Sequence, residues 1–368
     1  MLGSRFASAD ASRPSGAPRR PRGLDPKKER DLLTTAFKDR WIDIVMWVVV
    51  AAVVGLVGYL GYAYLSTQNR ERTTSPAARS VANLSAIVRA QPNVAAARVK
   101  LAQALAADSR VAEAVTQYQA ALKIDPGNVD ALSGLGVIAM QRQQLKTAEG
   151  YWLKVIDLIG TAEMATKDQR LEVAYYYLGT TYVEMKRYQD AVGYLKEALR
   201  IRKDASDTHY MLSVAYRGLN LDDQAQQELD ITLAFDPNNA QANYDMGVLR
   251  LKAGDRATAA ELFRRSIDNA PSDKLALPTA ELKKFGDAAA HLAEAKKLTA
   301  TDAAKAVVEA RIAAALDPKS IDAVRIVARA YEQLGKKPEA TTAWQRVLQL
   351  SPKDPEAVKA TKGVSSGS

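Results

Sequence analysis

The sequence of 368 residues contains no cysteine, and this absence excludes several kinds of chemistry. No disulfide, thiolate metal site, cysteine nucleophile or acylated cysteine can occur within it. Histidine is almost as scarce, because His209 and His291 are the only two. Neither has another histidine near it in the sequence. We therefore expect no metal site and interpret both histidines as structural.

Signatures of catalysis and of nucleotide binding are also missing. There is no Gly-x-x-x-x-Gly-Lys-Ser/Thr or Gly-x-Gly-x-x-Gly segment, and no stretch of the chain reads as a plausible strand. Acidic side chains are interspersed with Lys and Arg, as on the solvated face of a helix. We expect neither an enzyme nor a bound cofactor.

The positive charge of the chain is uneven. Residues 1–40 carry ten Lys/Arg against five Asp/Glu, which supplies +5 of the net charge of +9. The rest has 41 Lys/Arg against 37 Asp/Glu, an excess too small to predict nucleic-acid binding. The first 24 residues are rich in Ser, Pro, Gly and Arg and cannot bury a core. We expect residues 1–40 to form a disordered basic tail; the alternative is an arm that grips anionic lipid or an acidic partner.

One long apolar run follows this tail. Residues 44–65 contain no charged side chain over 22 residues. As a helix, such a run reaches about 33 Å, enough to cross a hydrocarbon core of about 30 Å. The aromatic residues at its two ends suit the membrane interfaces: they are Trp41, Trp47, Tyr59, Tyr62 and Tyr64. We predict a transmembrane helix over residues 41–66. A cleaved signal peptide fits less well, because the run is too long and ends in bulky residues.

The orientation of this anchor follows from the Lys and Arg residues near it. Five precede it between residues 27 and 40, whereas three follow it between residues 70 and 79. This bias predicts a cytoplasmic N-terminus in the cell membrane and an extracytoplasmic C-terminal region. The reversed topology, with a cytoplasmic adaptor tethered to the membrane, is the alternative. The glycines Gly55, Gly58 and Gly61 would let two anchors pack closely, so a homodimer is a further possibility.

The remainder of the chain repeats itself every 34 residues. Pairs of prolines recur at that interval: they are Pro92 and Pro126, Pro237 and Pro271, and Pro318 and Pro352. Aligned on this period, the repeats cover 95–128, 129–162, 172–205, 206–239, 240–273, 287–320 and 321–354. Position 20 of the repeat is alanine in all seven, and position 8 is small in six. Small residues at both positions would let two helices cross closely.

This pattern resembles the tetratricopeptide repeat (TPR) family over about 240 residues. The resemblance implies an all-α fold, a right-handed superhelix of about seven helix pairs over residues 95–354. We expect a linker and capping helix over 67–94, and a C-terminal cap and tail over 355–368. Repeat 287–320 is the weakest match, with Glu294 at the small position 8. Insertions at 163–171 and 274–286 interrupt the array; the first lengthens a helix, and the second forms a loop or an extra helical turn.

The resemblance also implies where partners would bind. In TPR arrays the first helix of each pair lines the concave groove, through positions that include 5 and 9. Three consecutive repeats carry tyrosine at position 5 and a β-branched residue at position 9, which would suit a bound peptide or helix. The candidate groove residues are Tyr176, Thr180, Tyr210, Val214, Tyr244, Val248, Arg325 and Arg329. Packing between repeats is the competing interpretation of the tyrosines. We expect a scaffold that binds protein partners during bacterial envelope assembly, translocation or maturation.

Overall fold

The computed structural model describes residues 46, 49–64, 75–160 and 168–362. The chain divides into two compact units, Met1–Arg79 and Ser80–Ser368. The predicted tail, residues 1–40, and part of the predicted linker lie outside the described residues.

The first unit contains part of the predicted anchor. Residues 49–64 are helical, and apolar side chains such as Val54 and Leu60 are exposed. Residues 41–45, 47, 48, 65 and 66 of the predicted span are not among those described. Within the described part of the chain, no helix is both long and apolar enough to cross a bilayer. The structure therefore does not support the predicted anchor, which stays a prediction.

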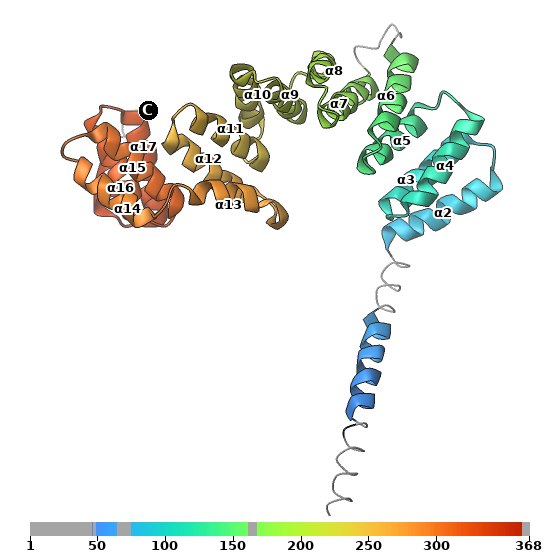
Figure 1. Cartoon of the computed structure of the whole chain (residues 1–368), viewed down its shortest axis with the longest axis horizontal. Coiled ribbons are helices and arrows are strands. Elements are labelled where there is room, and N and C mark those ends of the chain that lie inside the picture. The colour runs from blue at the N-terminus through green and yellow to red at the C-terminus, as the bar shows by residue number, and fades with distance from the viewer. Residues whose placement is uncertain (1–45, 47–48, 65–74, 161–167, 363–368) are drawn as a thin grey trace, which may run out of the picture. The chain divides into compact units, whose positions relative to one another are not determined.

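The second unit is a succession of helices, and α2, Pro76–Ala90, leads into it. Each predicted repeat contains one helix pair, and Figure 1 shows the pairs in succession. The pairs are α3 (Ala95–Ala107) and α4 (Val111–Ile124), α5 (Val129–Gln141) and α6 (Leu145–Gly160), α7 (Gln169–Glu184) and α8 (Tyr188–Ile201), α9 (Ser206–Gly218) and α10 (Asp222–Phe235), α11 (Ala240–Lys252) and α12 (Arg256–Asn269), α14 (Ala288–Leu298) and α15 (Ala303–Leu316), and α16 (Ile321–Gln333) and α17 (Lys337–Leu350). The described part of this unit is an all-helical TPR-like solenoid and contains no strand.

The turns that separate the helices follow from a few side chains. Between repeats, Asn128, Asn239 and Ser320 cap the next helix by accepting a hydrogen bond from the backbone amide three residues on. Within repeats, position 15 has a left-handed backbone in six of the seven: these residues are Ser109, Gln143, Lys186, Asn220, Gly254 and Gly335. The chain thus reverses direction at fixed points of the 34-residue period.

The core of the array lies where the two helices of each pair cross. Every position-20 alanine is buried, and the wedge residues at position 24 are buried as well: these are Tyr118, Trp152, Leu195, Leu229, Phe263, Ala310 and Trp344. Glycine at position 8 admits the wedge, because a Cβ on Gly179 would lie 2.6 Å from the Cγ atom of Leu195. The small residues at positions 8 and 20 therefore set the close spacing of the helices.

The second insertion forms a helix of its own. The 3₁₀ turn Ser272–Lys274 leads from the fifth repeat into the insertion. The insertion continues as α13, Ala276–Lys283, which packs against α12 through buried Leu282 and, just beyond the helix, Phe285. Helix α12 also packs against α15. The insertion thus brings the second helices of the fifth and sixth repeats together, which a regular stack does not do.

The sixth repeat departs from the predicted alignment by one residue. Its first helix begins at Ala288, whereas the first helices of the second, fourth, fifth and seventh repeats begin at position 1. Ala295, not Glu294, is consequently the buried small residue of this helix, and Glu294 is exposed. This corrects the predicted register of the first helix; the second helix keeps the common register.

Short helices cover both ends of the array. At the N-terminal end, Val81 and Val88 of α2 join the apolar cluster of the first repeat. At the C-terminal end, α18, Pro355–Lys362, packs against α17, and its Ala357 is buried. The first insertion is described only from Asp168 onward, where α7 begins before its predicted repeat.

Candidate functional site

The three predicted groove tyrosines lie at equivalent places on three consecutive first helices. Tyr176 is on α7, Tyr210 on α9 and Tyr244 on α11, and each is half-buried. This degree of burial leaves part of each ring accessible. Their hydroxyl groups nevertheless differ in what they contact. This difference shows which tyrosine serves packing between repeats and which are available to bind a partner.

Tyr210 uses its hydroxyl to join two repeats. It donates a hydrogen bond to Asp245 Oδ2 on α11 over 3.0 Å, and Arg217 of α9 forms an ion pair with the same carboxylate. Burial raises the pKa of Tyr210 well above its usual range, and the negative charge of Asp245 adds to this effect. Burial also raises the pKa of Asp245, although Arg217 opposes the shift. Tyr210 is therefore a structural link between repeats.

Tyr176 and Tyr244 do not use their hydroxyl groups to join repeats. The Tyr176 hydroxyl interacts with the side chain of Thr180 in its own helix, and within the described residues the Tyr244 hydroxyl makes no hydrogen bond. The Tyr176 ring meets Tyr177 edge-on at 5.2 Å between centroids, and the Tyr244 ring lies 5.8 Å from Phe263. Each therefore presents an apolar ring, held by its neighbours, with a polar tip that can donate to a ligand.

The β-branched residues at position 9 follow these tyrosines by four residues, about one helical turn. Thr180 donates a hydrogen bond from its hydroxyl to the backbone carbonyl of Tyr176, and Val214 and Val248 are half-buried. Since the Thr180 hydroxyl is satisfied within its own helix, all three side chains offer mainly apolar surface. Repeats 3 to 5 thus provide apolar area beside the hydroxyl group of Tyr244.

The two predicted groove arginines have a different role. Arg325 contacts Asp354 at 2.7 Å and Asp322 at 2.8 Å, and Arg329 forms a two-bond pair with Glu356 at 2.6 and 2.8 Å. Glu356 belongs to the capping helix α18, and Asp354 immediately precedes it. These arginines tie the cap to α16, and their guanidinium groups are already engaged.

A second pattern, which sequence reasoning missed, ties the turn before the first helix to that helix in four of the repeats. Four side chains donate to the backbone carbonyl six residues earlier: these are Arg98, His209, Asn243 and His291. Three of them also contact the side chain at position 23 of the same repeat. For Arg98 and His209 the signal was available in the sequence as a hydrogen-bonding residue at position 4 paired with Gln or Glu at position 23. His291 is at position 5 of its predicted repeat and falls into the pattern only in the register that the structure shows.

The histidines are the most fully engaged members of this pattern. His209 Nδ1 lies 2.6 Å from Glu228, and Nε2 lies 2.9 Å from the Lys203 carbonyl. His291 repeats the arrangement with Glu309 at 2.5 Å and the Phe285 carbonyl at 2.8 Å. Both nitrogens of each ring are thus used by the protein. Across the described residues no cluster of three metal-ligating side chains occurs.

Repeats 2 and 3 are joined by a polar network. The Tyr182 hydroxyl donates to Glu149 over 3.0 Å, and Arg187 contacts the same carboxylate while stacking over the Tyr182 ring. Burial, followed by the bond to Glu149, raises the pKa of Tyr182 to about 12. The carboxylate thus receives hydrogen bonds from two different elements.

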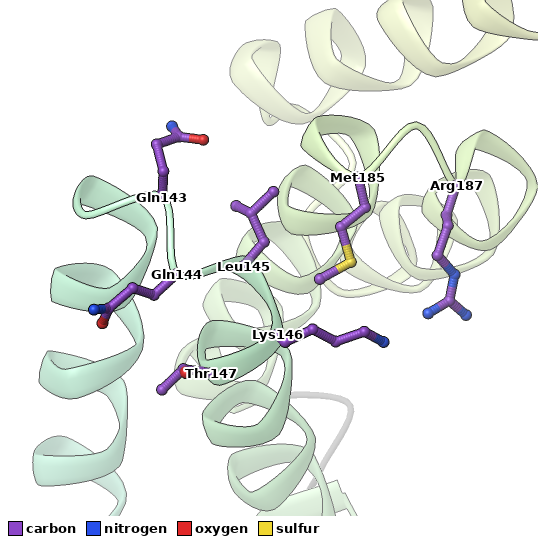
Figure 2. Close-up of a pocket in the computed structure, with 7 residues that line it drawn as sticks. All are labelled: Gln143, Gln144, Leu145, Lys146, Thr147, Met185 and Arg187. Atoms are coloured by element: carbon purple, nitrogen blue, oxygen red, sulfur yellow. The ribbon is translucent and has the colours of Figure 1, made fainter.

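Two cavities adjoin these repeats. A wide depression of about 740 Å³ lies between the α5–α6 and α7–α8 turns, and Figure 2 shows Lys146 and Arg187 at its edge. Both cations already contact Glu149. A narrower cavity of about 500 Å³ is formed by α11, α12 and α13, and Tyr244 and Leu277 line it. The inserted helix therefore provides a wall beside the last groove tyrosine.

Comparison with protein families gives consistent matches over the centre of the chain. Tetratricopeptide repeat models match residues 129–204, 182–244 and 241–273, and a TPR repeat model matches residues 102–143. These four matches support assignment to the tetratricopeptide repeat family.

Individual relatives are more distant. Cellulose synthase 1 operon protein C of Komagataeibacter xylinus is 26% identical over 247 residues, which is 65% of this chain but 17% of that protein. Among solved structures, YrrB, described as a TPR protein with an unusual peptide-binding site, is 21% identical. That match covers 54% of this chain and 97% of YrrB, with a TM-score of 0.43. MamA is 23% identical over 46% of this chain and 94% of MamA, with a TM-score of 0.40.

Proposed function

Because its central region carries tetratricopeptide repeats, we propose that this chain is a non-catalytic scaffold that binds segments of other proteins. The observation that carries the proposal is the accessible surface of Tyr176 in the third repeat and Tyr244 in the fifth, neither of which joins one repeat to the next as Tyr210 does. A peptide or helix laid across α7, α9 and α11 would bury the rings and accept hydrogen bonds from the hydroxyls.

The proposal includes a place in the cell. The apolar run at residues 44–65 would hold the scaffold at a membrane, and the basic residues before it favour an array outside the cytoplasm. An envelope role in assembly, translocation or maturation suits this location. The relative named for a cellulose synthase operon is in keeping with such a role, although the similarity covers a small part of that protein.

Site-specific photo-crosslinking tests the groove. A benzophenone amino acid replaces Tyr176 or Tyr244 in the full chain, and Tyr194 serves as the matched control because it lies on α8, a second helix. Irradiated membranes should yield the same partner bands from positions 176 and 244 and none from position 194. Equal crosslinking from all three positions would sink the groove proposal.

Protease treatment of spheroplasts tests the orientation independently. An extracytoplasmic array is digested when the protease is added outside, whereas a cytoplasmic adaptor is protected until the membrane is lysed. Release of the full chain by high salt or carbonate would instead argue against an anchor at residues 44–65.

A further inference from the structure

A cavity of about 520 Å³ lies among α12, α15, α16 and α17. In the sequence, these helices follow the three groove tyrosines. The cavity is a consequence of the inserted helix. Because α13 follows α12, the chain brings α15 rather than α14 against α12. The second helices of the fifth, sixth and seventh repeats therefore share one hollow, which the regular repeat pattern does not create.

The lining of this cavity combines an apolar part with a charged rim. Val324 and Val327 of α16 reach it, together with Ala314 and Ala343 from the flanking helices. Tyr331 lines it as well, half-buried, and burial raises the pKa of that residue. A hollow of this size and composition can receive one or two apolar side chains.

Two of the four arginines at the rim are held by the protein. Arg311 makes a two-bond pair with Glu261, both bonds at 2.7 Å. Arg264 donates to the carbonyls of Ala315 and Leu316 at the end of α15, at 2.7 and 3.2 Å. These contacts fix α12 to α15 and give the cavity a firm wall.

The other two arginines have donors to spare. Arg265 and Arg346 are exposed, and in the described part of the chain no carboxylate pairs with either. Arg346 donates to Gln349 through Nη1. Both arginines occupy position 26 of their repeats and line the same cavity. Their guanidinium groups can take a carboxylate with charge-assisted hydrogen bonds.

We propose that this cavity binds a segment of a partner protein in which an acidic side chain lies next to an apolar one. The apolar side chain fills the space against Val324 and Val327, and the carboxylate pairs with Arg265 or Arg346. The carboxylates of Glu261, Asp268 and Glu339 line the same cavity. Because these carboxylates would repel the neighbouring charges of a polyanion such as a nucleic acid, the mixed rim favours a single, placed negative charge.

This site is separate from the tyrosine groove, because none of its lining residues belongs to α7, α9 or α11. It would give the scaffold a second point of attachment with different chemistry. Its test therefore does not depend on the outcome at Tyr176 and Tyr244.

Fluorescence anisotropy with short labelled peptides on the purified full chain tests the proposal. One peptide alternates Glu and Leu, a second has Ser in place of Leu, and a third has Lys in place of Glu. The variants are the double substitution Arg265→Ala/Arg346→Ala and the cavity-filling Thr342→Trp. Lys154→Ala is the matched control, since Lys154 is an exposed residue at position 26 of the second repeat.

The Glu/Leu peptide should bind in preference to the other two. The double substitution should weaken its affinity by about tenfold to a hundredfold, since a hydrogen bond to a charged group is lost. Thr342→Trp should weaken it as well, and Lys154→Ala should leave it unchanged. No binding of the Glu/Leu peptide, equal binding of the Lys/Leu peptide, or full affinity in the double variant would overturn the proposal.

Discussion

Replacing one glycine by alanine tests how the helices of a pair approach each other. Gly179 lies inside α7 at position 8, and a Cβ there would lie 2.6 Å from Cγ and 2.8 Å from Cδ2 of Leu195. Leu195 is fully buried at the wedge position, and its backbone nitrogen is 3.4 Å from the same point. The side chain has little room to move, so α7 and α8 must separate.

The magnitude follows from two opposing terms. Overpacking of a well-packed core costs about 1–3 kcal/mol. Replacing glycine by alanine inside a helix contributes about 0.5–1 kcal/mol in the other direction. Gly193→Ala in α8 measures the second term alone, because Gly193 is also inside a helix of the same repeat and a Cβ there meets nothing within 4 Å. The difference between Gly179→Ala and Gly193→Ala is therefore the clash itself, about 1–3 kcal/mol.

Urea unfolding of the two variants, followed by circular dichroism, measures this difference. Gly193→Ala should raise the unfolding midpoint slightly and Gly179→Ala should lower it. Hydrogen exchange should locate the loss in α7 and α8, because neighbouring repeats interact only with one another. If Gly179→Ala is as stable as Gly193→Ala, close crossing at position 8 does not hold the repeat together, and the packing argument fails.

Three other predictions concern turns, pH and the cap. Gln143→Gly should stabilise the array by about 0.5–1 kcal/mol. Gln143 has a φ of 57°, and the strain of this left-handed backbone exceeds the conformational entropy that glycine adds to the unfolded chain. Urea unfolding measures the change in stability, and a loss of stability would contradict the prediction. Tyr182 has a pKa of about 12 in the folded chain against about 10 when unfolded, so its contribution is complete below about pH 10 and is lost as the pH rises towards about 12. Unfolding midpoints measured over that window should fall less in Tyr182→Phe than in the unmodified chain, and parallel falls would refute the assignment. Asp354→Ala removes the partner of Arg325 and the group that caps the Ala357 amide. Amide exchange should therefore accelerate in α18 but not in α9. Unchanged exchange in α18 would show that Asp354 does not hold the C-terminal cap in place.

The helix pairs could be predicted from the sequence because their causes are local. Alanine at position 20, proline near position 32 and a capping residue at position 34 act within a few residues of where they stand. For the same reason the sixth repeat was misaligned in its first helix: Glu294 interrupts the local signal, and only packing shows that Ala295 takes the buried place.

The candidate groove was predictable in part. Tyr176, Tyr210 and Tyr244 share a repeat position, and the sequence assigned them to one face. It could not tell their hydroxyl groups apart, because the partner of Tyr210 is Asp245, 35 residues away in the next repeat. Arg325 and Arg329 were likewise indistinguishable from free cations until the contacts of Asp354 and Glu356 were seen.

The sequence by itself determined that this chain is an array of helix pairs with no cysteine chemistry, since periodicity and composition are properties of the chain alone. The tertiary structure decided which polar side chains are engaged and which are available. It also decided that a short insertion becomes α13 and brings α12 against α15, which creates the arginine-rimmed cavity. Such features depend on contacts between residues distant in sequence, so no local pattern records them.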